Sequence, residues 1–123
     1  MKELSLIVAT EFSRTPGVRT ADESGDGNFS GEKFLAALLY PRFVEAVQQD
    51  AVLVVNLDGT AGYATSFLEA AFGGLVRGEP SAGIPPSPLA LVKRHLQVID
   101  TQDGYLEEEI NEYMADARAA LVA

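Results

Sequence analysis

The segment "AVLVVNL", residues 51–57, limits the fold more than any other part of the chain. It is nearly all apolar and rich in valine, a pattern typical of a strand that is covered on both faces. Apolar runs at residues 4–10 and 95–99 predict two further strands. Segments with helical periodicity separate the three runs, and parallel strands need such crossover connections. The sequence therefore predicts an α/β fold with a small central mixed or parallel sheet of about three to four strands, packed by helices.

Amphipathic segments supply the helices. The first begins at Ser30, the predicted N-cap, and Pro41 is expected to kink or break it near Tyr40 into two pieces. A second helix is predicted over residues 66–77 and a short one over residues 88–94.

Two details of these helices concern packing and capping. Gly73 and Gly74 weaken the 66–77 helix by about 1 kcal/mol each relative to alanine, and the close approach of a neighbour would explain them. Asp103 is the predicted cap of a terminal helix. The apolar stripe of that helix consists of Leu106, Ile110, Tyr113, Met114, Ala117 and Leu121.

The formal net charge of -9 excludes whole classes of partner. So acidic a surface repels phosphate backbones and anionic lipids, and neither nucleic acid nor a membrane is expected to bind. The chain has no cysteine, which excludes disulfides and thiolate chemistry. With 123 residues and only short apolar runs, we expect one cytoplasmic domain over residues 1–123, alone or as a small homo-oligomer.

A polar loop over residues 13–30 is the first candidate site, since loops of this length usually serve a function. Within the segment 22–33, the spacing up to Phe29 imitates an EF-hand calcium loop, but Lys33 stands where a bidentate glutamate belongs. Cation binding and a solvated polar loop are both left open, and no metal ligands are assigned.

The chain shows no recognisable catalytic set. "SGEK" at residues 30–33 has the spacing of serine-lysine acyl enzymes without a supporting motif. "GTAGYATS" at residues 59–66 lacks the second glycine and the lysine of a phosphate-binding loop. His95 is the only histidine, and we expect it at the surface or at a strand edge. Neither enzymatic activity nor a cofactor is expected.

Ser66 is either a regulated hydroxyl or only the start of a helix. Glu69 follows three residues later, so "SFLE" predicts a capping box in which Ser66 accepts from the amide of residue 69 and the glutamate reaches back. A cap of this kind stabilises by about 1 kcal/mol, which alone would explain the serine.

The stretch "VLVVNLDGTAGYATSFLEAAFGGLV" resembles the STAS domains of anti-sigma factor antagonists. With "SGEKFLAALLYPRF" upstream, the closer resemblance is to STAS-like domains of unknown function, over roughly residues 4–122. The resemblance implies that Ser66, or its neighbour Thr65, is phosphorylated by a partner kinase of the histidine-kinase-like ATPase type. Ala64 and Phe67 depart from the aspartate and the glycine that flank the serine pair in true antagonists.

We therefore expect a non-catalytic regulatory module that binds a protein partner such as a histidine-kinase-like ATPase. Loop 13–30 and the turn 59–66 are the expected contact surface. The residues predicted to contact the partner or an anion are Arg14, Arg19, Gly59, Thr60, Gly62, Tyr63 and Glu69. The alternative for the two arginines is a role as solvated loop charges, and for Tyr63 it is packing into the core.

The competing hypothesis is a small-molecule or anion sensor, or a small enzyme, that uses the 59–66 turn. The amides of this turn, at the start of a helix, would then hold a nucleotide or another anion.

Overall fold

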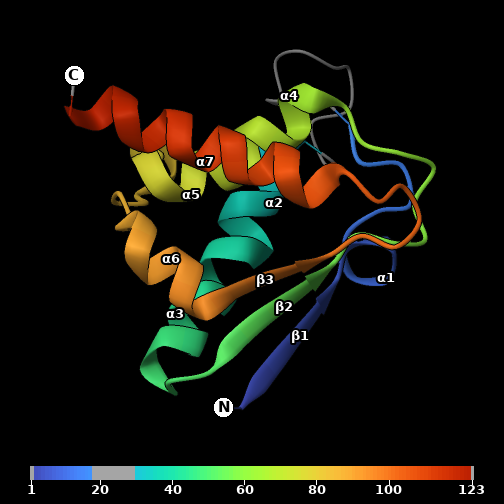
Figure 1. Cartoon of the computed structure of the whole chain (residues 1–123), viewed down its shortest axis with the longest axis horizontal. Coiled ribbons are helices and arrows are strands. Elements are labelled where there is room, and N and C mark those ends of the chain that lie inside the picture. Colours follow the sequence, from blue (N-terminus) through green and yellow to red (C-terminus); the bar gives the residue numbers. More distant parts are fainter. Residues whose placement is uncertain (1, 18–29, 123) are drawn as a thin grey trace.

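The computed structural model describes residues 2–17 and 30–122. Its centre is a three-stranded parallel sheet in the order β1 (Glu3–Ile7), β2 (Val52–Asn56) and β3 (Leu96–Ile99) (Figure 1). In register, Leu6 lies beside Val55, and Val55 beside Val98. The predicted α/β fold with a small parallel sheet is confirmed.

The first strand is shorter than predicted. The sequence predicts an extended segment over residues 4–10, but β1 ends at Ile7 and the single helical turn α1 (Val8–Glu11) follows. The carboxylate of Glu11 accepts a hydrogen bond from Ile7 N–H at 2.8 Å, which holds this turn against the end of the strand. Such a contact leaves no trace in the hydropathy pattern.

Burial alternates along β2, the central strand. Leu53 and Val55 are fully buried, whereas Val52 and Val54 on the opposite face are only half-buried. The prediction that this strand is covered on both faces is therefore wrong. An unbroken apolar run carries no periodicity that could show which face the core occupies.

The helix after Ser30 continues without a break over residues 31–48. It consists of α2 (Gly31–Phe34), the π-helical turn η3 (Leu35–Leu39) and α3 (Tyr40–Gln48). The Ser30 hydroxyl accepts a hydrogen bond from Lys33 N–H at 3.1 Å, which confirms the predicted cap. Of the predicted kink or break near Tyr40, the break is wrong, but the regular α-helix is interrupted by the wider π-helical turn over Leu35–Leu39, directly before Pro41.

The next helix begins one residue before the predicted start. Its parts are α4 (Thr65–Leu68), the π-helical turn η4 (Glu69–Gly73) and α5 (Gly74–Arg77). It crosses the 31–48 helix closely: a Cβ at Gly31 would lie 2.5 Å from the Phe67 carbonyl oxygen, and one at Gly74 would lie 2.7 Å from Leu35 Cδ2. The close packing predicted at Gly74 is confirmed.

After the 3-10 turn η5 (Pro80–Ala82), α6 (Leu89–His95) leads directly into β3 and begins one residue later than predicted. Of the two places predicted for His95, the surface is wrong; the residue ends α6 directly before the edge strand β3. Its side chain is only 3% exposed, and Nδ1 lies 2.7 Å from the carbonyl oxygen of Ala51. The imidazole of His95, in the last turn of α6, lies next to the start of β2. There it forms a hydrogen bond with the buried carbonyl of Ala51, which would otherwise lack a partner in the described chain.

Helix α7 (Leu106–Val122) closes the core. The predicted stripe is largely confirmed, since its buried members are Leu106, Ile110, Met114 and Ala117. The predicted cap is not: the carboxylate of Asp100, rather than that of Asp103, accepts from the amides of Gly104 and Leu106, both at 2.9 Å. Asp100 directly follows β3, so its carboxylate links the end of this strand to the start of α7.

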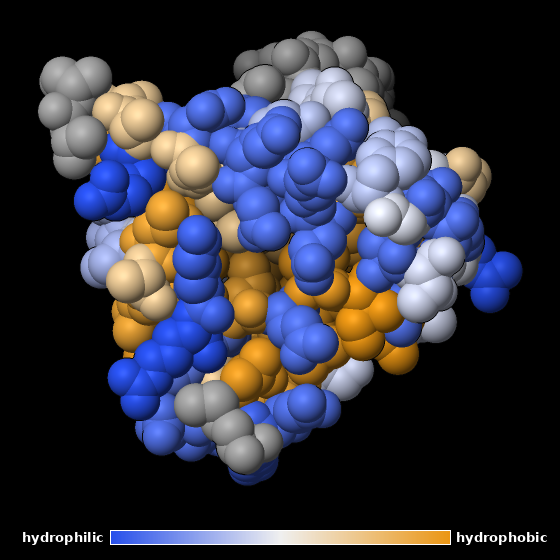
Figure 2. Space-filling view, viewed as in Figure 1, coloured by the Kyte–Doolittle hydropathy of each residue, from blue (hydrophilic) through white to orange (hydrophobic). Residues whose placement is uncertain are grey.

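The surface near α7 is partly hydrophilic and partly hydrophobic (Figure 2). Hydrophilic side chains lie along α7, and hydrophobic atoms are visible between α7 and the sheet (Figure 2). Among residues 2–17 and 30–122, no helix combines the length and the hydrophobicity needed to cross a bilayer.

Candidate functional site

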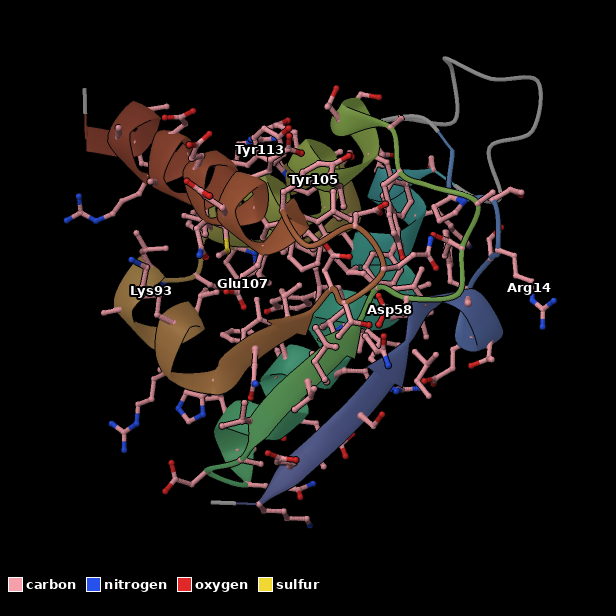
Figure 3. The ribbon with its side chains drawn as sticks, turned by 45° about the vertical axis from the view of Figure 1, so that its right-hand side comes forward. Arg14, Asp58, Lys93, Tyr105, Glu107 and Tyr113 are labelled. Carbon is pink, nitrogen blue, oxygen red and sulfur yellow. The ribbon has the colours of Figure 1, made fainter. Side chains whose placement is uncertain are left out.

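The candidate site lies where β2 and β3 end, because parallel strands bring their carboxyl ends to one edge of the sheet. The Asp58 carboxylate accepts hydrogen bonds from the amides of Thr101 and Gln102, each at 2.9 Å, and from the Thr101 hydroxyl. These bonds, above all that from the hydroxyl, lower the pKa of Asp58. Asp58 therefore joins the turn after β2 to the turn after β3 (Figure 3).

Gln102 holds the turn over residues 59–63 in place. Its side-chain oxygen accepts from Gly59 N–H at 3.1 Å, and its side-chain nitrogen donates to the carbonyl of Thr60 at 3.0 Å. Gly59 and Gly62 have φ angles of +92° and +139°, which residues with a side chain rarely adopt. Four of the predicted contact residues, Gly59, Thr60, Gly62 and Tyr63, thus share one fixed turn, in which Thr60 is buried and the two glycines supply the bend.

Tyr63 packs inward, as its alternative role requires. Its hydroxyl donates to the carbonyl of Leu57 at 2.8 Å, and its ring centroid lies 5.9 Å from that of Phe67. Burial raises the pKa of Tyr63 well above its ordinary value, and the carboxylates of Asp100 and Asp58 raise it further. The phenol therefore remains protonated and closes the turn against the core.

The helix that follows presents its first residues to solvent. Ala64 is the N-cap and Thr65 the first helical residue, so Ser66 lies inside the helix rather than at its cap. The predicted capping box is wrong, because the cap uses no side chain and the Glu69 carboxylate binds Arg77. Thr65 is exposed and Ser66 is half-buried. In the described parts of the chain, no group accepts a hydrogen bond from their two amides.

A shallow cavity of about 370 Å³ lies beside the two hydroxyls. Thr65, Ser66 and Glu69 line it from the helix, and Tyr113 lines it from α7. Tyr113 is labelled on α7 in Figure 3. These four residues are called the front pocket below. Partial burial raises the pKa of Tyr113, and the neighbouring carboxylates, first that of Glu109, add to the rise. The sequence predicts Tyr113 as part of the apolar stripe of α7. Its polar hydroxyl is the one sequence feature that indicates a half-buried position at the pocket.

Glu69 and Arg77 form an ion pair along one helix. Both guanidinium NH groups of Arg77 bind the Glu69 carboxylate, one of them at 3.0 Å, although the residues are eight positions apart. A Cβ at Gly73 would lie 2.6 Å from the Glu69 carboxylate and 3.0 Å from the guanidinium. Gly73 therefore makes room for this pair, which fixes the Glu69 wall of the front pocket.

The two arginines predicted as contacts have different outcomes. The carbonyl of Arg14 accepts from Ala61 N–H at 2.8 Å, so Arg14 lies against the turn, and its exposed side chain points away from the protein (Figure 3). Arg19 and most of the segment 22–33 lie outside the described residues. Within the described part of the chain, no acidic or histidine cluster could hold a metal ion.

Some amides at the start of the turn are not available to a phosphate. The amides of Asp58, Gly59 and Ala61 are already bonded within the protein. The carboxylates of Asp58 and Asp100 lie at the same edge of the sheet. An anion held by the turn would lie near these two carboxylates, and the amides of Thr65 and Ser66, which have no acceptor in the described chain, would be available to it.

Comparison with protein families identifies this fold. Residues 31–105, more than half of the chain, match the family described as STAS-like domain of unknown function (DUF4325). The chain belongs to this family. Comparison with curated proteins gives no match, and neither does comparison with solved structures. The resemblance inferred from the sequence is confirmed at the level of the family.

Most of the candidate site lies within the matched residues 31–105. In this STAS-like domain the matched range includes Gly31, where the two helices cross, and the front-pocket residues Thr65, Ser66 and Glu69. Tyr113 lies outside it. The front pocket therefore combines a wall that lies inside the matched range with a wall from α7 that lies outside it.

The bonds to Asp58 make stability depend on pH. Its folded-state pKa lies below the ordinary 3.8, so the stability that it contributes is present above pH 3.8 and is lost as the pH falls through the folded value. We expect Asp58→Asn to melt at a lower temperature than the wild type at pH 7. The difference should vanish in strong acid, and thermal melts across this range check it. An equal difference at every pH would contradict this role of the carboxylate.

Proposed function

We propose that this STAS-like domain is a non-catalytic regulatory module whose front pocket binds a partner protein, and that the partner is a histidine-kinase-like ATPase which phosphorylates Ser66 or Thr65. One observation carries the proposal: the two hydroxyls open a helix whose residues 70–76 are all buried. Both residues line the front pocket, so a partner can reach their hydroxyls. Because the rest of the helix is buried, a change at them acts on an element that is anchored in the core.

A phosphate at this position would act as an electrostatic switch. It would add roughly −1.5 to −2 charges at neutral pH beside two amides without an acceptor in the described chain. The helix dipole favours such a charge, whereas Glu69 in the same pocket repels it. We expect the helix start to tolerate the phosphate and the partner to lose its fit, because the charge of the docking surface changes.

Two further features support a binding role in the cytoplasm. His95, the only histidine, is buried against a backbone carbonyl, so it does not reach the front pocket as a general base. The chain has no cysteine, in keeping with a reducing compartment, where we place the protein.

The test compares how much of the partner protein is recovered by variants at Ser66 and by a control variant on another helix. Tagged wild type, Ser66→Ala and Ser66→Glu would be used to capture proteins from an extract of the source cells. Ala90→Glu is the matched control, because it adds the same charge to the exposed first turn of α6. Wild type, Ser66→Ala and Ala90→Glu should recover a histidine-kinase-like ATPase, and Ser66→Glu should recover about tenfold less.

Incubation of the recovered complex with ATP provides the second readout. The wild type should gain phosphate on the peptide that contains Thr65 and Ser66. Equal recovery by Ser66→Glu and the wild type would overturn the docking site. Capture of no such ATPase, together with a saturable rise in melting temperature on adding nucleotide, would favour the anion-sensor alternative.

A further inference from the structure

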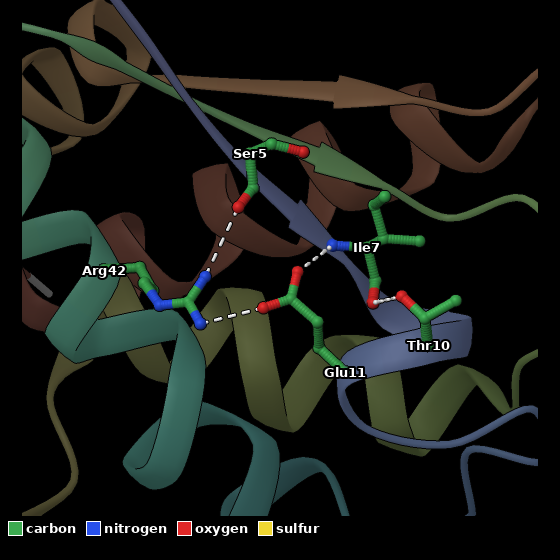
Figure 4. Close-up of polar contacts among 5 residues, drawn as sticks. All are labelled: Ser5, Ile7, Thr10, Glu11 and Arg42. Atoms are coloured by element: carbon green, nitrogen blue, oxygen red, sulfur yellow. Dashed lines mark hydrogen bonds and ion pairs between the residues drawn. The ribbon is translucent and has the colours of Figure 1, made fainter.

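The two edges of the sheet differ. At the β1 edge, Arg42 donates to the carbonyl of Ser5 at 3.3 Å, and Glu11 accepts from Ile7 N–H at 2.8 Å (Figure 4). Arg42 and Glu11 also bind each other at 2.8 Å. This ion pair offers β1 one donor and one acceptor, as a residue of a neighbouring strand would. The β1 edge is therefore closed to a further strand.

The β3 edge lacks such a cover. Leu57 N–H donates to the carbonyl of Ile99 at 2.8 Å, so the backbone of Ile99 faces β2. Since successive residues of a strand face opposite sides, the N–H and C=O of Val98 point away from β2. No other described residue forms a hydrogen bond with them. A parallel strand edge of this kind can pair with another extended chain.

A groove of about 320 Å³ follows this open edge. Its lining includes Val92 and Lys93 of α6, Leu96 and Val98 of β3, and Glu107 and Met114 of α7. Hydrophobic atoms show between the hydrophilic side chains of α7 and the sheet in Figure 2. α7 packs mainly on η4 and α5 rather than on β3, so the groove separates α7 from the strand edge, where Val98 is 8% exposed.

Opposite charges face each other across the groove. Lys93 rises from α6 and Glu107 from α7, on the two sides of the opening (Figure 3). Both are exposed, and neither forms an ion pair with another residue in the described parts of the chain. A ligand that carries an acidic and a basic group at its two ends would therefore find a partner for each.

We propose that this groove binds an extended segment of a partner protein, which adds to β3 as a fourth strand. An extended polypeptide supplies both a donor and an acceptor that can pair with the Val98 backbone. An apolar side chain of the segment would cover Leu96 and Met114, an acidic one would face Lys93, and a basic one would face Glu107. A second copy of this chain fits less well, because each copy carries a net charge of -9.

The experiment selects peptides from a displayed random heptapeptide library on the intact protein. The wild type should enrich sequences with alternating apolar residues between one acidic and one basic residue. The double variant Lys93→Glu, Glu107→Lys should enrich the reverse charge order and bind the wild-type peptides about tenfold more weakly. Both substitutions lie at exposed positions, so folding should be unaffected.

Amide NMR shifts locate the bound peptide. The largest shifts should fall on Val98 and its strand neighbours, and Ser66→Glu should leave the affinity unchanged. The proposal is overturned if no peptide is enriched, if both proteins select the same peptides, or if the shifts centre on the front pocket. It is also overturned if sedimentation shows a dimer that Glu107→Lys dissociates, since a second copy would then occupy the edge. The double variant should still recover the ATPase, which separates this inference from the proposed function.

Discussion

Replacing Phe67 by alanine is expected to lower the free energy of unfolding by about 3–5 kcal/mol. Its side chain is fully buried, and its ring centroid lies 6.0 Å from that of Phe12, 5.7 Å from that of Phe34 and 5.9 Å from that of Tyr63. These rings come from different parts of the chain and meet around Phe67. Its removal leaves a cavity at the point where the turn and the α4 start are fixed to the core.

Urea unfolding at neutral pH measures this loss, and Tyr105→Ala is the matched control. Tyr105 is 55% exposed, so its truncation should change the stability by only about 0.5 kcal/mol or less. A loss below about 1 kcal/mol for Phe67→Ala would mean that the aromatic cluster does not hold the helix start.

The second large effect is expected for Gly31→Ala. The added Cβ would lie 2.5 Å from the carbonyl oxygen of Phe67 and 3.0 Å from the Cβ of Ala70. A backbone carbonyl inside a helix cannot move aside as a side chain does, so the two helices must separate. We expect a loss of about 1–3 kcal/mol, although alanine is the better helix former.

Gly74→Ala is the control at the same crossing. There the new Cβ meets Cδ2 of Leu35, the far end of a side chain that can rotate. Denaturant unfolding should therefore rank Gly31→Ala as the less stable variant. The opposite order would show that the crossing is not set by the backbone contact between Gly31 and Phe67.

The layout of the fold could be predicted because it follows from the spacing of apolar residues. Three apolar runs separated by helical segments predict a parallel sheet, and the Ser30 cap follows from one side chain and its neighbours. Burial on both faces of β2 was wrongly predicted, since "AVLVVNL" has no alternation from which a face could be assigned.

The errors at the candidate site have another cause. Ser66 and Glu69 have the spacing of a capping box, but the helix starts at Thr65 and Glu69 binds a residue eight positions later. That contact needs the π-helical turn and the space above Gly73, neither of which the spacing reveals. The front pocket also depends on Tyr113, which only the packing of α7 brings to Ser66. Local patterns predict elements, whereas a site between elements requires their packing.

The most direct measurement is site-specific photocrosslinking in the source cells. A photoreactive amino acid would replace Thr65, at the exposed edge of the front pocket, or Gln49, which is exposed directly after α3 and before the start of β2 (α3 and β2 in Figure 1). We predict an adduct with a histidine-kinase-like ATPase from position 65 and none from position 49. Adducts of that ATPase from position 49 alone, or equally from both, would contradict docking at the start of α4.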